Sequence, residues 1–500
     1  MKFFKTIIAV FSICAGLVSC TGEKPGDEKT YSILFTENPV MVGANGGEIS
    51  AIFISEHEWT AEAVSKWISD VTVADGEVSF TVEANPTEDL RNGKIRFSVV
   101  GDDYTQDLTI RQVGNTGKLK VDKAEVSLST LGEKVEVKVN SGENWIPSTS
   151  AEWVTAVRKN STTLEISAKP NFGDVDLKAD IVVETASGNE KETIKVTQKA
   201  DNEAFAGAST PRGKEFVYKM NGSITKVIEE NAYTVGDHVK ALEMQYRHQT
   251  GSSVSPYSIF VYEVDLTGDV TILASCVNDD PASIKTTDQE WTEVATIRDQ
   301  FYAMQTKRPE IDLLCGINGD FCYGDSSYGR KNFLHGIMYK DGNCLKDTFD
   351  GGAVCTIFAM MKDGTARIMT QKEYPNYKSQ IQEAIGGRVH ILSGGQKFTF
   401  TDSSLEPRTA IGVSADMKKV IMLVVDGRRS SYSVGANYEF MANIFLAFGA
   451  TDAINLDGGG SSTFTLKNAS ASKGFQTRNR PTDGTGDRAI PNGLAVVRKK

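Results

Sequence analysis

The sequence has few of the residues that most often hold metals or form cross-links. Its 500 residues include only 7 cysteines and 5 histidines. The cysteines form no CxxC pair and no histidine pair accompanies them, so their spacing fits no zinc pattern. A positive charge surplus is also lacking, because the formal net charge is −11 at pH 7. That sign argues against nucleic acid as a partner, since phosphate backbones need a basic surface.

Long apolar runs are lacking as well. The apolar run Ile7 to Val18 is too short to span a membrane comfortably, and no later run is long enough to do so. Lys2 and Lys5 precede this run, so residues 1–20 have the pattern of a targeting segment rather than part of the fold.

The end of this segment, Leu17-Val18-Ser19-Cys20, resembles a bacterial lipobox. The resemblance implies that Cys20 is lipidated and becomes the mature N-terminus; ordinary secretion with cleavage near the same point is the alternative. We expect an exported lipoprotein at the outer membrane or cell surface, with a periplasm-facing position as the other option. Residues 21–30 would be its tether, and the membrane would be contacted only through the lipid anchor.

Five further cysteines lie after residue 200: Cys276, Cys315, Cys322, Cys344 and Cys355. An odd number cannot all pair within one chain. Export permits disulfides, and Cys315 with Cys322 could bridge a loop. Free buried thiols are the other interpretation.

Residues 30–200 repeat with an offset of 86. The recurring pairs are Gly46 and Gly132, Trp59 and Trp145, Trp67 and Trp153, Asn85 and Asn171, Ile95 and Ile181, and Gln112 and Gln198. Alternating apolar and polar runs in each unit, separated by turn residues at intervals of about ten, are typical of a β-sandwich. We therefore predict two all-β sandwich modules, at 31–115 and 116–200.

The first module resembles a BACON domain, a small sandwich found on exported proteins of gut Bacteroidetes. The resemblance rests on Trp67-Ile68, Glu83 to Pro86, Arg91 and Ile110 to Val113. The second module keeps the matching Trp, Asn and Gln but has Leu177 where the first has Arg91. Such modules are linked with carbohydrate binding, but many act as spacers. We favour a spacer, because the tryptophans fit core positions and form no exposed aromatic cluster.

Residues 201–214 are small and polar and predict a linker. Beyond it we expect an α+β catalytic domain at 215–500, with strands and helices in no clean alternation. Predicted strands cover 215–220, 238–246, 258–265, 313–317, 420–425 and 453–456, and predicted helices cover 291–308 and 438–448.

Three of these strands run into an aspartate beside a glycine. The three are Asp320, Asp426 and Asp457. Strand ends hold side chains rigidly at one rim of a sheet, where sites are commonly built. Arg408 begins another strand and Arg428 follows Asp426, and guanidinium groups bind phosphate in a bidentate manner. A turn is the better explanation of each Asp-Gly taken alone, and a surface charge is the better explanation of each Arg. The five residues together, all at the ends of apolar strands, make a functional site an equal alternative.

These residues form part of an ordered series of motifs: Asn318 to Phe321, Gly386-Gly387 with Gly394-Gly395, Arg408 to Gly412, Val425 to Arg428, Asn455 to Ser462, and Arg488 to Asn492. The series resembles the phosphodiester glycosidase family over roughly residues 215–498. The resemblance implies hydrolysis of a sugar-1-phosphate diester at its glycosidic bond, which releases free sugar and a phosphomonoester. A GlcNAc-1-phosphodiester is the substrate type it suggests.

The residues suit that chemistry. A carboxylate would stabilise the oxocarbenium-like centre or activate water, with Asp457 and Asp426 as candidates and Asp320 third. Phosphate and sugar contacts are expected from Arg408, Arg428, Asn318, His335, Ser461 and the amides of Gly458, Gly459 and Gly460.

Two other functions remain open at this point. One is a surface lipoprotein that binds a glycan or sugar phosphate without turnover. The other is a glycosidase for neutral glycans, for which Arg408 would matter little. We predict no cofactor and no metal site, although three carboxylates at one rim could hold Ca²⁺ through oxygen ligands. The expected partner is the sugar-phosphate or glycan substrate, and the expected state is a monomer.

Overall fold

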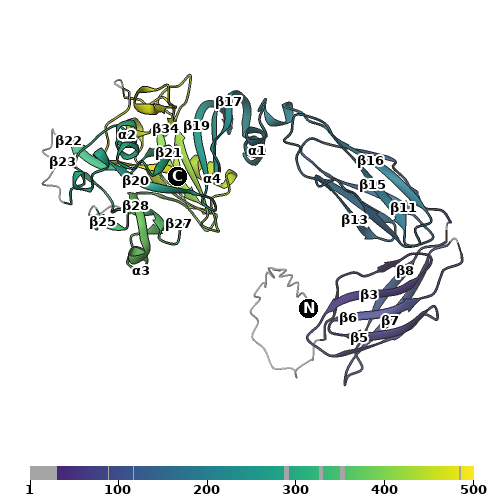
Figure 1. The fold of residues 1–500 in the computed structure, drawn as a ribbon. Helices are drawn as coiled ribbons and strands as arrows, with labels where there is room; N and C mark the ends of the chain where they lie inside the picture. The colour runs from purple at the N-terminus through teal and green to yellow at the C-terminus, as the bar shows by residue number, and fades with distance from the viewer. Residues whose placement is uncertain are drawn as a thin grey trace. The chain divides into compact units, whose positions relative to one another are not determined.

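The structure is a computed structural model that describes residues 31–87, 89–115, 117–286, 292–325, 330–349, 355–483 and 486–500. The proposed lipidation site Cys20 and the tether lie outside these residues. The chain divides into two compact units, one built mainly from residues before 197 and one mainly from residues after it. Figure 1 shows the two sandwiches of the first unit and the mixed second unit.

The first sandwich has two four-stranded sheets. One has the order β1-β3-β6-β5 and the other β2-β8-β7-β4. Their bounds are β1 Leu34–Phe35, β2 Val40–Val42, β3 Gly47–Ile54, β4 Trp59–Ala63, β5 Ile68–Ala74, β6 Glu77–Val82, β7 Arg91–Val99 and β8 Thr105–Gln112. Alternate residues of β6 and β7 are buried, as the period-2 pattern predicts. Trp59 is only 4% exposed and belongs to the core.

The second sandwich repeats this arrangement with the orders β10-β16-β15-β12 and β13-β14-β11-β9. Its strands are β9 Lys120–Val121, β10 Glu125–Leu128, β11 Lys134–Asn140, β12 Trp145–Ser148, β13 Val154–Asn160, β14 Thr163–Ala168, β15 Leu177–Thr185 and β16 Lys191–Gln198. Trp145, the counterpart of Trp59, is 1% exposed.

The repeat extends to the buried amides. The Gln112 side chain donates to three backbone carbonyls at 2.9–3.0 Å, and the Gln198 side chain donates to the three equivalent carbonyls at 2.8–3.3 Å. The acceptor pairs are Gly43 and Ser129, Ala44 and Thr130, and Glu83 and Lys169. Because a buried amide must find acceptors, these glutamines fix the same strand junction in both modules.

The two modules differ at one contact, where the sequence has Arg91 in the first and Leu177 in the second. Arg91 Nε donates to Gln112 Oε1 at 2.7 Å, and the guanidinium stacks 4.3 Å from the Trp67 ring. In the second module the corresponding oxygen, Gln198 Oε1, is buried without a hydrogen-bond partner among the described residues.

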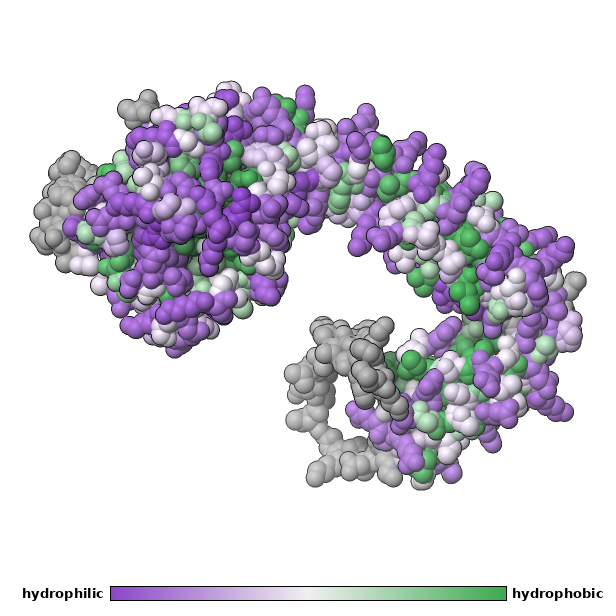
Figure 2. Space-filling view, in the orientation of Figure 1, coloured by the Kyte–Doolittle hydropathy of each residue, from purple (hydrophilic) through white to green (hydrophobic). Residues whose placement is uncertain are grey.

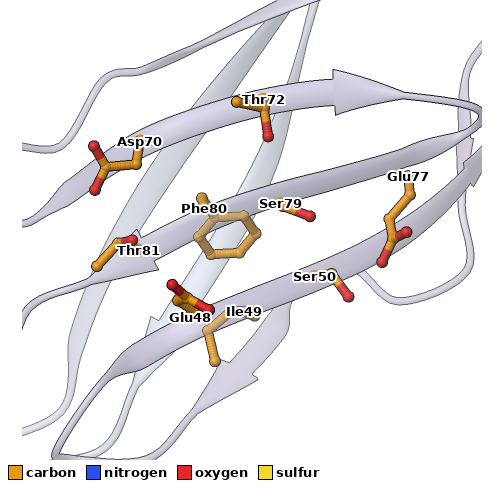
Figure 3. A pocket seen from close by; sticks show the side chains of 9 residues that line it. All are labelled: Glu48, Ile49, Ser50, Asp70, Thr72, Glu77, Ser79, Phe80 and Thr81. Atoms are coloured by element: carbon orange, nitrogen blue, oxygen red, sulfur yellow. The ribbon is translucent and has the colours of Figure 1, made fainter.

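A hollow on the β3-β6-β5 sheet of the first sandwich presents carboxylates and hydroxyl groups (Figure 3). The one aromatic side chain that lines it, Phe80, is only 2% exposed. A sugar therefore finds no open aromatic face in this hollow, and the spacer role stays a prediction.

The second unit is built around an eight-stranded sheet of order β17-β18-β19-β32-β31-β33-β29-β30. Its strands are β17 Ile224–Gly236, β18 Val239–Thr250, β19 Ser253–Asp265, β29 His390–Ser393, β30 Gln396–Lys397, β31 Arg408–Val413, β32 Lys419–Val425 and β33 Asp452–Leu456. Strands β32 and β33 both pair antiparallel with β31. They therefore run in the same direction, and Asp426 and Asp457 follow strand ends at the same edge of the sheet.

Three smaller sheets complete the unit, with the orders β20-β36-β21-β34-β35, β22-β23 and β25-β24-β28-β26-β27. Their strands are β20 Val270–Cys276, β21 Ile311–Asn318, β22 Cys322–Asp325, β23 Arg330–Leu334, β24 Met338–Lys340, β25 Asn343–Lys346, β26 Thr356–Met361, β27 Ala366–Thr370, β28 Ile381–Gly387, β34 Phe464–Lys467, β35 Phe475–Thr477 and β36 Asn492–Lys499. One apolar core joins both five-stranded sheets to the eight-stranded sheet. It includes Tyr262 and Phe464, whose rings stack at 3.7 Å.

Four α-helices lie in the described part of this unit: α1 Pro211–Lys219, α2 Ile297–Lys307, α3 Tyr374–Tyr377 and α4 Tyr438–Ala447. The unit is therefore richer in strands than the expected α+β domain. The strand predicted at 215–220 is wrong, because this segment belongs to α1. Thr210 caps the helix by accepting from the Gly213 amide, and Pro211 occupies its first turn.

The helix predicted at 291–308 begins only at Ile297, where Thr296 is the N-cap, and Trp291 lies outside the described residues. Helix α4 agrees with its prediction. Asn437 caps its start by accepting from the Phe440 amide at 2.8 Å, and Gly449 follows its end at φ +82°. The visible surface of the chain is mostly hydrophilic (Figure 2), and no helix among the described residues combines the length and apolarity needed to cross a membrane.

Candidate functional site

The site is built where the end of β21 meets the end of β33. The Asp457 amide donates to the Gly319 carbonyl at 3.0 Å. The Asn318 side chain donates to the Asp457 carbonyl at 2.7 Å. These two bonds tie strands from different sheets together, and they hold Asp320 and Asp457 beside each other at the rim.

Asn318 is fully buried and serves this junction. Its side-chain oxygen accepts from the Thr409 hydroxyl at 2.7 Å and from the Thr463 amide at 3.0 Å. The sequence predicts that Asn318 orients sugar or phosphate. In the structure its side-chain oxygen accepts hydrogen bonds from protein groups, and its side-chain nitrogen positions the backbone of Asp457.

Asp457 is the only one of the three predicted carboxylates that is partly exposed, and the other two are buried. Burial of most of its carboxyl group raises its pKa to about 6, against the opposing effects of the Ser461 hydroxyl and the Arg488 charge. Ser461 also accepts from Arg488 Nη1 at 3.2 Å. Asp457, Ser461 and Arg488 therefore form a connected polar group at the glycine loop.

Asp320 lies deeper, at 2% exposure. Its carboxylate accepts from the Gly336 amide at 2.8 Å, and its own amide donates to Asn492 Oδ1 at 2.9 Å. Desolvation raises the pKa of Asp320 to about 7, and the nearby Asp457 raises it further in the same direction. A Cβ on Gly386 would lie 2.5 Å from Asp320 Oδ2, so the carboxylate fits only because this neighbour is glycine.

Asp426 is held in a closed set of hydrogen bonds. Its oxygens accept from Asn479 Nδ2 at 2.9 Å, the Arg480 amide at 2.8 Å and the Tyr432 hydroxyl at 3.0 Å. Burial raises its pKa. Asn479 also donates to the Ser462 carbonyl at 2.9 Å. Asp426 is thus joined to the glycine loop through Asn479, as a support for the loop.

The glycine loop, Gly458 to Ser461, forms a short 3₁₀ turn over residues 459–461. Two of its amides bond within the protein: that of Gly459 to the Pro407 carbonyl and that of Ser461 to the Gly458 carbonyl. The Gly458 amide lowers the pKa of Asp457 by a hydrogen bond. Of the three glycine amides expected to contact an anion, those of Gly458 and Gly459 are therefore already hydrogen-bonded within the protein.

Two guanidinium groups approach this loop instead. The terminal nitrogens of Arg428 lie 3.5 and 3.6 Å from where a Gly459 Cβ would stand, and Arg488 Nη2 lies 2.3 Å from where a Gly460 Cβ would stand. Glu406 orients Arg428 through its Nε at 2.7 Å, and Asp483 orients Arg488 at 2.7 and 3.0 Å. A Cβ on Gly460 would displace Arg488, whereas a Cβ on Gly459 would be in ordinary van der Waals contact with Arg428.

Arg428 also has an unusual backbone, with φ +58°. For a residue with a Cβ this left-handed conformation costs of the order of 1 kcal/mol or more, and such strain gathers at functional sites. The strained turn places the Arg428 side chain against the loop.

Arg408 is placed differently from the prediction. Successive residues of a strand face opposite sides, and because Thr409 faces Asn318, Arg408 faces α4. Its guanidinium bonds with the Ala436 carbonyl at 3.1 Å and the Tyr438 hydroxyl at 3.2 Å, and its side chain is 11% exposed. These contacts make Arg408 a support for α4 and do not favour the expected phosphate contact.

His335 is buried, beside Gly336, and its amide donates to the Phe321 carbonyl at 3.0 Å. Arg388, which follows the predicted Gly386-Gly387 pair, lies 5.5 Å above the Phe321 ring. Cys322 also lies close to Asp457 and Asp320, and burial raises its pKa to about 12. The rim thus carries His335, Arg388 and a neutral thiol around the two carboxylates.

All five cysteines in the described part of the chain are free thiols, including Cys315 and Cys322. The bridge between those two that the sequence allowed is not formed. Among the described residues no three His, Cys, Asp or Glu side chains converge as metal ligands.

Several residues at the site were not singled out from the sequence. Arg488 and Asn492 lie in the last of the ordered motifs, so that motif was the available signal. Asn479 and Asp483 lie in a loop whose sequence has no strand or helix pattern. Only the tertiary structure brings this loop to the glycines.

Two parts of the chain match the sequence models of known families. Residues 312–497 match the sequence model of the phosphodiester glycosidase family. Residues 57–113 match the BACON model, described as a putative N-terminal binding domain. The uncharacterized SPbeta prophage-derived protein YomE of Bacillus subtilis is 33% identical over 153 residues, which are 27% of this chain and 22% of that protein. The chain thus spans about a fifth of the length of that relative.

Solved structures give weaker likenesses. The catalytic domain of zebrafish N-acetylglucosamine-1-phosphodiester alpha-N-acetylglucosaminidase, auto-inhibited by its pro-peptide, is 20% identical at a TM-score of 0.39, covering 55% of this chain and 89% of that one. A hypothetical protein from Synechocystis is 10% identical at a TM-score of 0.37, covering 93% and 100%. Neither likeness is strong enough to transfer a substrate. Residues 312–497 are thus similar to the phosphodiester glycosidase family, and residues 57–113 before them are similar to a BACON domain.

Proposed function

We propose that this protein hydrolyses the glycosidic bond of a sugar-1-phosphodiester, with a GlcNAc-1-phosphodiester as the type of substrate. Water attacks the anomeric carbon, the bond from that carbon to the phosphate oxygen breaks, and free sugar and a phosphomonoester result. The observation that supports the proposal is that the partly exposed Asp457 precedes a glycine loop which the guanidinium groups of Arg428 and Arg488 approach.

Asp457 is the group we assign to the reacting centre. With a pKa of about 6 it is mostly ionised at neutral pH, so it can stabilise positive charge at the anomeric carbon or accept a proton from water. Asp320, with a pKa of about 7, is about half protonated there. A protonated neighbour does not repel the Asp457 charge, so the buried pair tolerates one negative charge.

Arg428 and Arg488 would hold the diester phosphate. Charge-assisted hydrogen bonds of this kind contribute roughly 1.5–3 kcal/mol each. Because a phosphomonoester is a good leaving group, the site needs no strong general acid. In this assignment Asp426, Asn318 and Arg408 are positioning residues, since their hydrogen bonds go to the protein.

The test is turnover of a chromogenic GlcNAc-1-phosphodiester by the full chain and by Asp457→Asn. We expect release of free sugar by the native chain and a loss of at least about 10²-fold in the variant, with unchanged thermal unfolding. Tight binding of several sugar phosphodiesters without turnover would instead indicate a binding protein. Equal rates on neutral glycosides, with Arg428→Ala unaffected, would indicate an ordinary glycosidase.

The export and anchoring expected from residues 1–30 are part of the same proposal. Lipidation at Cys20 would hold the enzyme at the membrane surface, with the sandwich modules between anchor and site. Metabolic labelling with a palmitate analogue, lost in Cys20→Ser, is the matching test.

A further inference from the structure

A third guanidinium group stands at the rim, and the function proposed above does not use it. Arg388 lies between β28 and β29, two strands that belong to different sheets. Its amide donates to the Asn455 carbonyl at 3.1 Å, and the next amide, that of Val389, donates to Asn455 Oδ1 at 2.6 Å. Asn455 is two residues before Asp457, so these bonds hold Arg388 at the end of the strand that carries the candidate catalytic carboxylate.

The side chain of Arg388 borders the segment that holds the second carboxylate. Its guanidinium carbon is 5.5 Å from the centre of the Phe321 ring, and Phe321 directly follows Asp320. Gly386 stands two residues before Arg388, and a Cβ added to it would lie 2.5 Å from Asp320 Oδ2. Both the backbone that leads to Arg388 and its side chain are therefore neighbours of the carboxylate pair.

Arg388 differs from the other two guanidinium groups of the site in its partners. Arg428 pairs with Glu406 at 2.7 Å, and Arg488 pairs with Asp483 at 2.7 Å. In the part of the chain that the structure describes, the Phe321 ring is the partner of the Arg388 guanidinium, and no carboxylate pairs with it. An aromatic face attracts a cation but accepts none of the N–H groups that lie in the guanidinium plane. This partly buried side chain can therefore still bind an anion.

Arg388 and the glycine loop lie on opposite sides of Asp457. In the eight-stranded sheet, β33 has β31 on one side and β29 on the other. The loop turns toward β31, where the Gly459 amide donates to the Pro407 carbonyl at 2.8 Å. Arg388 precedes β29, which runs antiparallel to β33 and so begins at the edge where β33 ends. The two loop-facing guanidinium groups and Arg388 thus flank the candidate catalytic carboxylate.

This arrangement separates the two ends of the proposed substrate. With the diester phosphate at the glycine loop and the anomeric carbon at Asp457, the sugar ring extends away from the phosphate, toward β29 and Arg388. A neutral sugar offers this guanidinium group only hydroxyl groups. A carboxylate or sulfate on the sugar would accept two parallel hydrogen bonds from it and balance its charge.

We propose that the preferred substrate carries an anionic group on the sugar itself, in addition to the phosphodiester, and that Arg388 binds this group. The inference rests on the function proposed above and names its substrate class, a 1-phosphodiester of an acidic sugar. Arg388 is then a residue for specificity, because its contact distinguishes an acidic sugar from the corresponding neutral one.

The test compares kcat/KM of the full chain for two matched pairs of substrates with one chromogenic leaving group. The 1-phosphodiesters of glucuronic acid and glucose differ only in the carboxylate at carbon 6. Those of 6-sulfated and unmodified GlcNAc differ only in the sulfate, so the two pairs distinguish the two kinds of anion. Arg388→Gln removes the charge, and Arg388→Lys keeps it without the planar fork. Arg111→Gln, at an exposed position of the first sandwich, is the control.

We expect the native chain to prefer at least one acidic substrate over its neutral partner by about tenfold or more, because a charge-assisted hydrogen bond is gained. The preference should nearly disappear in Arg388→Gln, be intermediate in Arg388→Lys and persist in Arg111→Gln. Equal kcat/KM within both pairs would overturn the proposal, and so would a preference that survives Arg388→Gln.

Two further outcomes separate this proposal from others. A preference for a sugar 1-diphosphate diester that is lost in Arg388→Gln would place the second anion on the leaving group, which overturns the proposal. If no substrate of either pair is turned over, the proposed hydrolysis is wrong. Isothermal titration of the same pairs then decides about Arg388: tighter binding of an acidic member that depends on Arg388 supports its role, and equal binding overturns it.

Discussion

The Asp457 amide donates a 3.0 Å hydrogen bond to the carbonyl of Gly319, the residue before Asp320. Asp457 follows a strand of the eight-stranded sheet, and Gly319 follows a strand of a different sheet. The bond therefore fixes the spacing of two acidic side chains that are 137 positions apart in the sequence. The chemistry of the rim depends on this junction.

Replacing Asn318 by alanine should loosen the junction. The substitution removes bonds to the Asp457 carbonyl, the Thr409 hydroxyl and the Thr463 amide, and each buried group left unsatisfied costs about 1–3 kcal/mol. We expect the free energy of unfolding in urea to fall by several kcal/mol. The exposed Asn376→Ala should change it by less than about 0.5 kcal/mol. Equal stability of both variants would contradict the role given to Asn318.

Gly460→Ala should affect the site more than the fold. Its new Cβ would meet Asp483 Oδ1 at 2.1 Å and Arg488 Nη2 at 2.3 Å, and both atoms are ends of side chains that can move. We expect nearly unchanged thermal unfolding but a KM for the phosphodiester raised about tenfold, because Arg488 is displaced from the loop.

Gly427→Ala is the contrasting variant. Its Cβ would meet backbone atoms, with the Pro407 nitrogen at 2.7 Å, so it should lower thermal stability clearly. A Gly460→Ala enzyme with unchanged KM would show that Arg488 does not contact the substrate.

Asp320→Asn should change how stability depends on pH. The folded-state pKa of Asp320 is about 7, above its ordinary value of 3.8, so the folded chain binds more protons than the unfolded chain between these values. This group therefore destabilises the fold progressively as pH rises from about 4 to 7. The neutral amide lacks that effect. We therefore compare the free energy of unfolding of the variant with that of the native chain at each pH. This difference should shift in favour of the variant by up to a few kcal/mol between pH 4 and pH 8, since one pKa unit is about 1.4 kcal/mol.

Urea unfolding of both proteins at pH 4, 6 and 8 is the measurement. Asp299→Asn is a useful control, because hydrogen bonds from Lys473 and Thr296 give Asp299 a lowered pKa. The lowered pKa of Asp299 affects stability only below about pH 4, so the effect of this control substitution should change little between pH 4 and pH 8. A difference between Asp320→Asn and the native chain that stays constant with pH would exclude a raised pKa at Asp320.

Leu177→Arg should stabilise the second sandwich. Gln198 Oε1 is buried there without a partner among the described residues, whereas the equivalent Gln112 oxygen accepts from Arg91 at 2.7 Å. Supplying a donor should recover about 1–3 kcal/mol, measured on the transition of the sandwich modules by calorimetry. The reciprocal Arg91→Leu should destabilise the first sandwich, while Arg111→Leu at an exposed position should do little. No gain in Leu177→Arg would mean that the oxygen is already satisfied.

Much of the fold follows from local pattern. The 86-residue offset, the alternating runs and the paired glutamines predict two similar sandwiches, because a period of two and its turns are visible in any strand. The buried strands before Asp320, Asp426 and Asp457 were predicted for the same reason. The segment 215–220 was predicted wrongly, because the helix start at Thr210 and Pro211 outweighs the apolar content that suggested a strand.

The sequence by itself determined which residue types stand at the ends of the strands, and with the ordered motifs it indicated the family. The sequence could not determine which side chains at the strand ends point toward the rim, since that depends on pairing between strands that are distant in the sequence. Tertiary structure alone made Asp457 the partly exposed carboxylate, enclosed Asp426 among Asn479, Tyr432 and Arg480, and turned Arg408 toward α4. It also brought Arg488 to the glycine loop, because burial and long-range hydrogen bonds exist only once the sheets have packed.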